Sequence, residues 1–153
     1  MAEESRPGLI MCVCTGKCPG FAKMDIWDFI NRARIELPVK YGFIHPQLCE
    51  EDGDRFLADF LRAGRPLVIA GCAPNMQYKL FRDAFAAAGR EVKRDLLPLD
   101  IRDLTTDEAV AKVEQALSGY DTTEAQRTRR PDGEDRTNTD GHDGRMQDTA
   151  RGE

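Results

Sequence analysis

The sequence lacks several features that would place it in a common class of protein. It contains no long hydrophobic run and its first residues are acidic, so we expect neither a membrane span nor a signal peptide. No basic stripe is present and the formal net charge is −5 at pH 7, which argues against nucleic acid as a partner. Without an export signal, the chain is expected in the reducing cytoplasm, where structural disulfides are rare.

Common catalytic and phosphate-binding motifs are also missing. Neither usual glycine-rich phosphate motif occurs, and no Ser/His/Asp constellation is apparent. Of the two histidines, His45 lies in an apparent strand beside Pro46, where we expect a packed or hydrogen-bonded side chain. His142 lies in a polar C-terminal stretch. The residues with distinctive chemistry that remain are the five cysteines.

Three of these cysteines lie close together near the start of the chain. A short apolar run ends in Cys12 and Cys14, and a turn containing glycine and proline then carries Cys18. An odd number of cysteines in a reducing compartment favours metal binding or thiol chemistry over a disulfide framework. Thiolates concentrated at the end of a strand suit a soft metal or redox chemistry.

Strand and helix patterns alternate along the chain. Apolar runs predict strands within residues 9–12, 41–45, 66–71 and, less clearly, 91–99. Helical spacing of apolar residues predicts helices over residues 26–37, 50–63, 76–88 and 106–117. Asp25 is a suitable cap for the first helix, and Thr105 and Glu108 have the spacing of a capping box. Trp27 is expected in the core.

This order predicts an α/β fold. We expect a single open, mostly parallel four-stranded sheet with helices on both faces, in a Rossmann-like three-layer arrangement formed by residues 1–119. From Tyr120 onward, Asp, Arg, Thr and Gly dominate the sequence. Residues 120–153 therefore have too little apolar surface to offset their ordering entropy, and we predict a disordered charged tail.

The predicted fold brings cysteines that are distant in sequence to one place, because the carboxyl ends of parallel strands meet at one edge of the sheet. Cys12 and Cys14 follow the first strand. Cys49 follows the second strand, and Cys72 follows the third. The leading hypothesis is a [4Fe-4S] cluster held by these four thiolates, with Cys18 either replacing Cys14 or lying beside the cluster.

Two other uses of the cysteines stay open. Zinc bound by the same thiols, in a structural or redox-sensor domain, is the metal alternative. A thiol-disulfide oxidoreductase that uses Cys14 and Cys18, or Cys12 and Cys14, is the enzyme alternative. It lacks the Cys-x-x-Cys spacing of thioredoxin-like sites.

Four stretches of the chain resemble the N-terminal domain of the heterodisulfide reductase A subunit, a flavin and iron-sulfur protein of electron-bifurcating complexes. They are Cys12-Val13-Cys14, Leu48-Cys49 before an acidic helix, Ala70–Pro74 leading to Leu80–Ala84, and Asp100–Asp103, which is similar to the family's Asn-Ile-Arg-Glu segment. These stretches follow the family's order and span about residues 8–119.

The resemblance implies one [4Fe-4S] cluster and favours Cys12, Cys14, Cys49 and Cys72 as its ligands. It also implies a role in passing electrons within a larger assembly, with flavoprotein and iron-sulfur subunits as partners. The flavin-binding and ferredoxin-like domains that normally follow are absent from these 153 residues, so we expect a separate flavoprotein and no bond-making chemistry by this chain. The segment that carries Cys18 departs from the family, which has Gly and Asn soon after the second cysteine.

Overall fold

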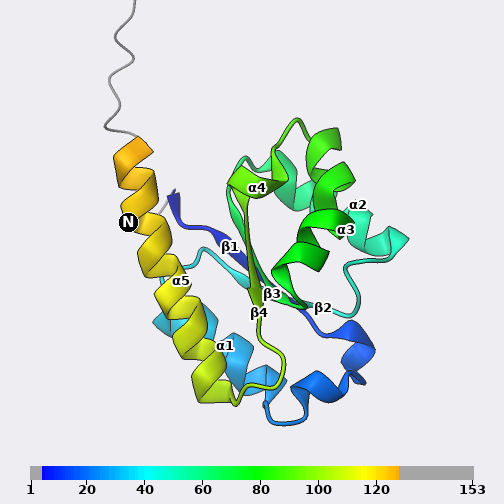
Figure 1. Ribbon diagram of the computed structural model, residues 1–153, viewed down its shortest axis with the longest axis vertical. Coiled ribbons are helices and arrows are strands. Elements are labelled where there is room, and N and C mark those ends of the chain that lie inside the picture. The colour runs from blue at the N-terminus through cyan, green and yellow to red at the C-terminus, as the bar shows by residue number, and fades with distance from the viewer. Residues whose placement is uncertain (1–4, 128–153) are drawn as a thin grey trace, which may run out of the picture.

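Four short apolar segments pair into one sheet in the computed structural model, which describes residues 5–127 (Figure 1). The strands are β1 (Gly8–Cys12), β2 (Gly42–His45), β3 (Leu67–Gly71) and β4 (Leu96–Asp100). Their order is β2-β1-β3-β4, and every neighbouring pair is parallel. The predicted α/β fold with four strands is confirmed, and the sheet is parallel throughout.

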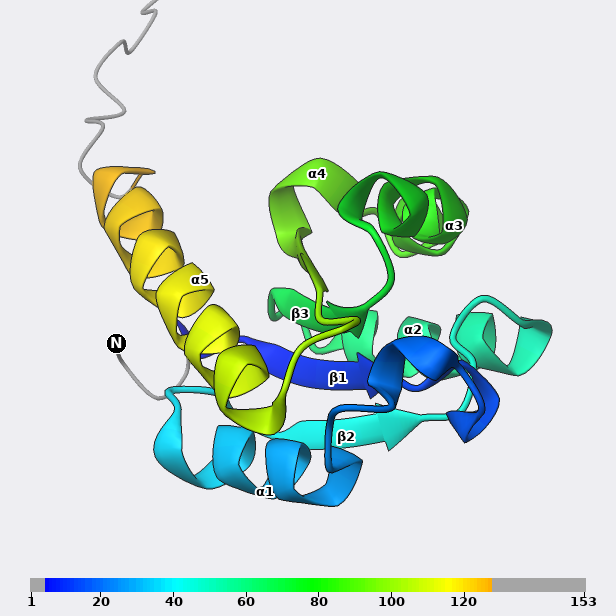
Figure 2. The same cartoon turned by 60° about the horizontal axis from the view of Figure 1, so that its bottom comes forward.

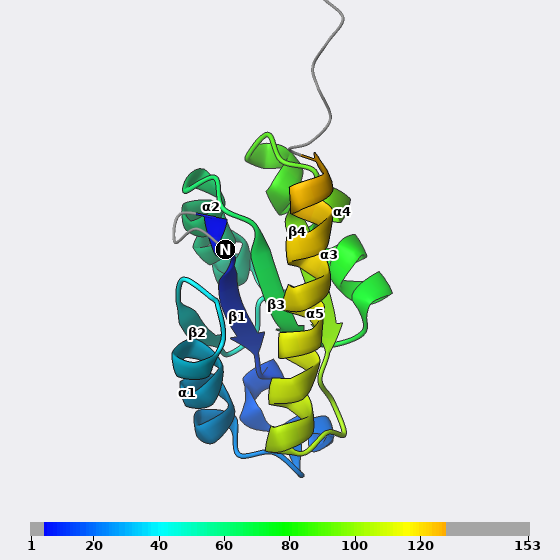
Figure 3. The ribbon, with the colours of Figure 1, turned by 90° about the vertical axis from the view of Figure 1, so that its left-hand side faces the viewer.

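Helices cover both faces of the sheet because each parallel strand must be reached by a crossover. The helices are α1 (Ile26–Glu36), α2 (Glu51–Arg62), α3 (Pro74–Ala87), α4 (Val92–Asp95) and α5 (Thr106–Arg127). Two short 3₁₀ turns, η2 (Cys14–Gly16) and η3 (Pro19–Phe21), follow β1. Figures 1 and 3 show α1 and α5 on one side of the sheet and α2 and α3 on the other. None of the helices within residues 5–127 has the length and apolar character that a membrane crossing requires.

The central strands are apolar on both faces and divide the core in two. Side chains alternate across a strand, so Leu9 and Met11 of β1 pack in the α1–α5 layer while Ile10 packs in the α2–α3 layer. All three are fully buried. On β3, Val68 and Ile69 divide in the same way. This two-sided burial explains the uninterrupted apolar run that predicts β3.

Both predicted helix caps are confirmed. The carboxylate of Asp25 accepts hydrogen bonds from the backbone N–H groups of Trp27 and Asp28, each at 3.0 Å, at the start of α1. At the start of α5, the Thr105 N–H donates to the Glu108 carboxylate at 2.8 Å, and the Thr105 hydroxyl accepts from the Glu108 N–H at 3.3 Å. These bonds satisfy N–H groups that have no partner within the helix.

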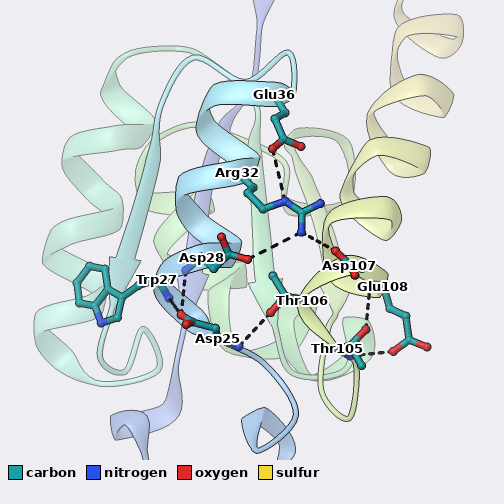
Figure 4. Close-up of polar contacts among 9 residues, drawn as sticks. All are labelled: Asp25, Trp27, Asp28, Arg32, Glu36, Thr105, Thr106, Asp107 and Glu108. Carbon is teal, nitrogen blue, oxygen red and sulfur yellow. Dashed lines mark hydrogen bonds and ion pairs between the residues drawn. The ribbon is translucent and has the colours of Figure 1, made fainter.

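Polar contacts also join α1 to α5 (Figure 4). The Asp25 N–H donates to the Thr106 hydroxyl at 3.0 Å, and Arg32 Nη1 lies 2.6 Å from Asp107 Oδ1. The same guanidinium lies 3.4 Å from a Glu36 oxygen and 3.9 Å from an Asp28 oxygen. Arg32 therefore connects carboxylates of both helices.

Four sequence-based expectations differ from the structure in position or burial. The strand expected within residues 91–99 begins only at Leu96. The preceding residues form α4, where Asp95 accepts bonds from the Glu91 N–H and from the side chains of Arg90 and Arg94. A local network of charge-assisted bonds thus favours a helical turn before β4. Helix α5 continues past Tyr120 to Arg127, and the rest of the predicted tail lies outside the described residues.

The prediction that Trp27 lies in the core is wrong. Its side chain is 70% exposed, and Figure 4 shows it pointing away from α5. The buried positions of α1 are Phe29, Ile30 and Ala33. Trp27 is two positions before Phe29, which places it on the opposite side of a helix with 3.6 residues per turn.

The apolar spacing of α3 predicts a buried face that includes Met76 and Leu80 together with Phe81 and Phe85, and the observed face is rotated from this one. Met76 and Leu80 are 51% and 39% exposed, whereas Gln77, Phe81 and Phe85 are buried. The apolar pattern of α3 is broad enough to fit two faces. The choice between them places a glutamine inside the protein.

Candidate metal centre

A small cavity lies at the carboxyl edge of the sheet, beside the ends of β1 and β3. Strand β1 lies between β2 and β3. The chain proceeds from β1 to β2 on one side of β1 and then to β3 and β4 on its other side, so the strand order reverses beside β1, at the position of the cavity. Open parallel sheets bind ligands at such switch points. Five lining residues are cysteines, namely Cys12, Cys14, Cys18, Cys49 and Cys72.

The cavity is too small for an organic cofactor. Its volume is about 130 Å³, whereas clefts for drug-sized ligands occupy about 300–1,000 Å³. Much of its wall is apolar, with contributions from Phe21, Ile69, Leu80 and Phe81. It therefore suits a compact inorganic group or a few water molecules.

Cys12 is the last residue of β1 and is already hydrogen-bonded. Its sulfur accepts from the backbone N–H of Leu48 at 3.3 Å. Gly71, at the end of β3, borders it so closely that a Cβ added there would lie 3.3 Å from the Cys12 Cβ. A glycine at the end of β3 lets the two strand ends approach each other beside the cavity.

The loop that carries Cys14 is strained. Cys14 and Thr15 have positive φ angles of 48° and 62°, and Gly16 follows at 73°. The left-handed region is unfavourable for residues with a Cβ, especially a branched one. A 2.7 Å hydrogen bond from the Thr15 N–H to the Pro46 carbonyl holds the loop against the residues after β2. Figure 2 shows this blue segment beyond the arrowheads of β1 and β2.

Cys18 lies on the same loop but is placed by a different contact. The turn after it packs on the aliphatic part of Arg102, since a Cβ on Gly20 would lie 2.9 Å from the Arg102 Cβ. The Asp103 N–H also donates to the Gly20 carbonyl at 2.6 Å. Cys18 is half-buried beside the α1–α5 core, whereas Cys14 is exposed.

Cys49 precedes α2 in a segment that packs tightly against that helix. A Cβ at Gly53 would overlap the Leu48 carbonyl, so only glycine permits this approach. The Gln47 side-chain amide donates to the Cys49 sulfur at 3.7 Å and to a Glu50 carboxylate oxygen at 3.0 Å. Cys49 is exposed at the mouth of the cavity.

Cys72 follows β3 and is half-buried. Its carbonyl accepts a 2.7 Å bond from Nε2 of Gln77, which also donates to the Leu99 carbonyl at 3.3 Å. Gln77 is completely buried and lines the cavity. The polar character of glutamine gave no signal for such a position in the sequence.

One cation, Arg102, lies in the cavity wall. Its Nε and Nη2 atoms lie 2.9 Å and 2.7 Å from the two carboxylate oxygens of Asp100. This paired hydrogen bonding raises the pKa of Arg102 and lowers the pKa of Asp100. Asp100 thus offsets much of the positive charge that the thiols would otherwise experience.

The electrostatics of the cavity disfavour free thiolates. Desolvation by nearby groups raises the pKa of Cys14 although its side chain is largely exposed, and the neighbouring Cys18 and Cys12 raise it further. Burial also raises the pKa of Cys72, with Cys12 adding to the effect. Thiols in this state keep their protons unless a cation enters and displaces them.

His45 behaves as predicted from its position in the strand. It is 7% exposed, its Nδ1 accepts from the Gln47 N–H at 3.1 Å, and its ring packs against Phe56 at a centroid distance of 4.9 Å. Its Nε2 lies 3.6 Å from an Asp52 oxygen. His142 lies outside the described residues.

The cysteines surround a space and do not converge on a point. Within residues 5–127, no three His, Cys, Asp or Glu side chains are arranged to hold one metal ion. A tetrahedral zinc site needs sulfurs about 2.3 Å from a common centre. In a cluster, each thiolate binds a different iron, so the sulfurs stand farther apart. The described residues therefore form a cavity lined by thiols without a preformed site for a single ion.

The structure brings Cys12, Cys14, Cys49 and Cys72 to one cavity, as the strand-end rule predicts, and it adds Cys18 to them. Their role as ligands stays a prediction. Sequence reasoning missed Gln47 and Gln77, whose contacts depend on the exact loop and helix geometry. In comparisons with known proteins, no family model matches the chain and no curated protein gives a significant match.

Proposed function

We propose that this chain is an electron-transfer protein or subunit that carries one [4Fe-4S] cluster on Cys12, Cys14, Cys49 and Cys72. The observation that supports this most directly is the gathering of five thiols from three strand ends around one small cavity. When bound, such a cluster would accept or donate one electron.

The chain's own residues suit that role. The Leu48 N–H and the Gln47 side-chain amide donate to the Cys12 and Cys49 sulfurs, and hydrogen bonds to sulfur tune cluster potentials. Apolar side chains such as Phe21 and Phe81 line the cavity and would exclude water. The exposed Cys49 and Cys14 lie at the side from which a redox partner would approach.

Cys18 remains the alternative fourth ligand. It lines the same cavity as Cys14 and lies four positions away on the same loop. We favour Cys14 because the resemblance to the heterodisulfide reductase A subunit matches the Cys12-Val13-Cys14 pair. In that assignment, Cys18 is a free thiol beside the cluster.

The proposed physiological setting follows the same resemblance. The chain would act in the cytoplasm within a heterodisulfide-reductase-like complex, exchanging electrons with flavoprotein and iron-sulfur subunits. A reducing compartment would keep the five thiols available for iron. In this setting the protein contributes position, dielectric and hydrogen bonding, and its partners carry out the chemistry.

The two competing functions have less support. A zinc domain would need a preformed convergence of ligands, which the geometry within residues 5–127 lacks. A dithiol enzyme that uses Cys14 and Cys18 needs a thiol with a lowered pKa, whereas the pKa of Cys14 is raised.

Anaerobic reconstitution tests the proposal. The full chain is incubated with iron, sulfide and a thiol reductant, desalted, and analysed for metal and acid-labile sulfide, and the dithionite-reduced sample is examined by EPR. About four irons and four sulfides per chain are expected, with a rhombic EPR signal on reduction. In a parallel incubation with Zn²⁺ alone, stoichiometric zinc binding by a chain that takes up no iron and sulfide would instead establish the zinc domain.

A further inference from the structure

Gln77 is the most unusual polar residue of the cavity. It lies on α3 and is 0% exposed, and its Nε2 donates to the carbonyls of Cys72 and Leu99. It therefore connects the turn after β3 to the end of β4. These two contacts satisfy the Nε2 donor of its amide group.

The oxygen of the Gln77 amide is in a different situation from its nitrogen. Gln77 Oε1 is buried and has no hydrogen-bond partner within residues 5–127. The orientation of the amide is fixed, because a flipped side chain would place the oxygen against two carbonyl oxygens. Most buried polar atoms have a partner, so an exception of this kind requires an explanation.

The position of the unpartnered oxygen suggests its role. Both donated bonds leave from Nε2 towards backbone carbonyls, and Gln77 forms part of the cavity wall. The unpartnered oxygen therefore belongs to a side chain that borders the same cavity as the thiols. A negative pole in a low-dielectric site opposes the addition of negative charge.

On the basis of the proposed function, we infer that Gln77 is a tuning residue that holds the cluster potential low. Reduction adds an electron to a group that already has four thiolate ligands, and the Gln77 oxygen makes that addition less favourable. The second glutamine of the cavity has the opposite polarity. Gln47 presents its N–H to the Cys49 sulfur, which favours the reduced cluster.

The two glutamines form a matched pair for an experiment. Gln77→Met and Gln47→Met each remove one amide of the same size from the same cavity wall. Midpoint potentials are measured by anaerobic redox titration of the reconstituted full-length chain, followed by EPR. We expect Gln77→Met to raise the potential and Gln47→Met to lower it. A roughly tenfold change in the ratio of reduced to oxidised cluster corresponds to about 59 mV for one electron.

A purely structural role for Gln77 gives a different result. If its amide only clamps Cys72 to β4, then Gln77→Met lowers the thermal midpoint of the apoprotein but leaves the potential unchanged. Gln77→Glu separates the two roles. Burial favours the protonated carboxyl at this position, so its O–H donates to one of the two carbonyls while its second oxygen takes the place of Oε1. Its potential is expected at or below that of the wild type, and it remains informative if the methionine variant does not fold.

The possible outcomes separate this inference from the function on which it rests. A wild-type chain that takes up no iron and sulfide overturns both. A wild-type chain that binds the cluster, together with a Gln77→Met variant whose potential is unchanged or lower, overturns only the tuning role. A raised potential in Gln77→Glu also contradicts it.

Discussion

The α1–α5 layer and the cysteine cavity differ in how well their polar groups are paired and in how favourable their backbone angles are. In the layer, both helices are capped, and Arg32 pairs with carboxylates of both helices. In the cavity, two non-glycine residues adopt positive φ angles, a buried amide oxygen has no partner among the described residues, and neighbouring thiols add to the raised pKa values of Cys14 and Cys72. The two regions belong to the same small domain.

This difference shows where stability and function are placed in the fold. Helix capping, core packing and ion pairing agree at the contact between α1 and α5, as expected of a region selected for stability. Violations of those rules concentrate at functional sites, where the rest of the fold compensates for them. The cavity contains several violations together. Substitutions in the two regions should therefore affect different measurements.

The largest expected effect is loss of the cluster without loss of the fold. Cys72→Ser should abolish most iron and sulfide binding, because on the proposed ligand set serine replaces the thiolate that directly follows β3. Cys18→Ser is the matched control and should retain about four irons per chain. Metal analysis after anaerobic reconstitution measures both, and thermal unfolding of the apoproteins should differ little from wild type. Retention of iron by Cys72→Ser but not by Cys18→Ser would reverse the ligand assignment.

The reverse pattern is expected in the α1–α5 layer. Phe29 is fully buried there, so Phe29→Ala should lower the free energy of unfolding by about 3–5 kcal/mol through lost burial and an added cavity. Denaturant titration of the apoprotein measures this loss. At temperatures where the variant is folded, its iron content should equal that of wild type. A selective loss of iron would show that the two regions are more tightly coupled than their contacts indicate.

Asp95 sharpens the comparison because it is a buried polar group whose bonds are satisfied, unlike Gln77. Burial opposes its ionisation, but hydrogen bonds from Arg94 and Arg90 outweigh burial and lower its pKa strongly. Asp95→Asn should therefore lower the free energy of unfolding at pH 7 by about 1.5–3 kcal/mol.

The pH dependence of that loss follows from the direction of the pKa shift. A carboxyl whose pKa is lowered by folding contributes stability above its unfolded pKa of about 3.9 and loses that contribution as the pH falls towards the folded value. The gap between wild type and Asp95→Asn should therefore be full at pH 7 and shrink below about pH 4. Urea titrations at several pH values measure it, and a gap independent of pH would contradict the shift.

A smaller loss is expected at the cap of α1. Asp25→Ala removes the acceptor for two backbone N–H groups and should cost about 1 kcal/mol of unfolding free energy. Asp25→Asn, which retains a side-chain oxygen, should recover most of that loss. The cluster content and potential should not change, since Asp25 does not line the cavity.

The smallest expected effect is a gain. Thr15 has a left-handed backbone in the strained loop, so Thr15→Gly should relieve strain by more than it adds flexibility to the unfolded chain. We expect the apoprotein to gain about 0.5–1 kcal/mol. Gly16→Ala is the opposing control, because φ is 73° there and nothing lies within 4 Å of an added Cβ, so strain is its only cost. Destabilisation by Thr15→Gly would show that the loop is not strained in the apoprotein.

Much of the fold follows from the sequence, because its local signals agree with one another. The apolar run of β3, the cap at Asp25 and the capping box at Thr105 each identify an element correctly. The parallel arrangement then follows from the alternation of strands and helices. The convergence of Cys49 and Cys72 on one cavity follows from the topology, without any local spacing signal.

The remaining features depend on geometry that periodicity does not contain. Trp27 lies on the side of α1 opposite Phe29, so its large apolar side chain is exposed although its residue type favours the core. Gln77 can be buried because its amide donates to the carbonyls of Cys72 and Leu99, and neither residue is adjacent to it in sequence. The helical turn before β4 depends on a side-chain network around Asp95, which apolar periodicity does not predict.

The spacing of the strand ends also has a consequence for biosynthesis. Cys12 and Cys72 are separated by about sixty residues, and β3 pairs directly with β1. During translation, the first three cysteines leave the ribosome long before the strand that completes the cavity, and such non-local pairing forms late. On the proposed ligand set, a nascent chain cannot complete the cluster until the centre of its sheet has formed. Incorporation of iron would therefore report that the domain has folded.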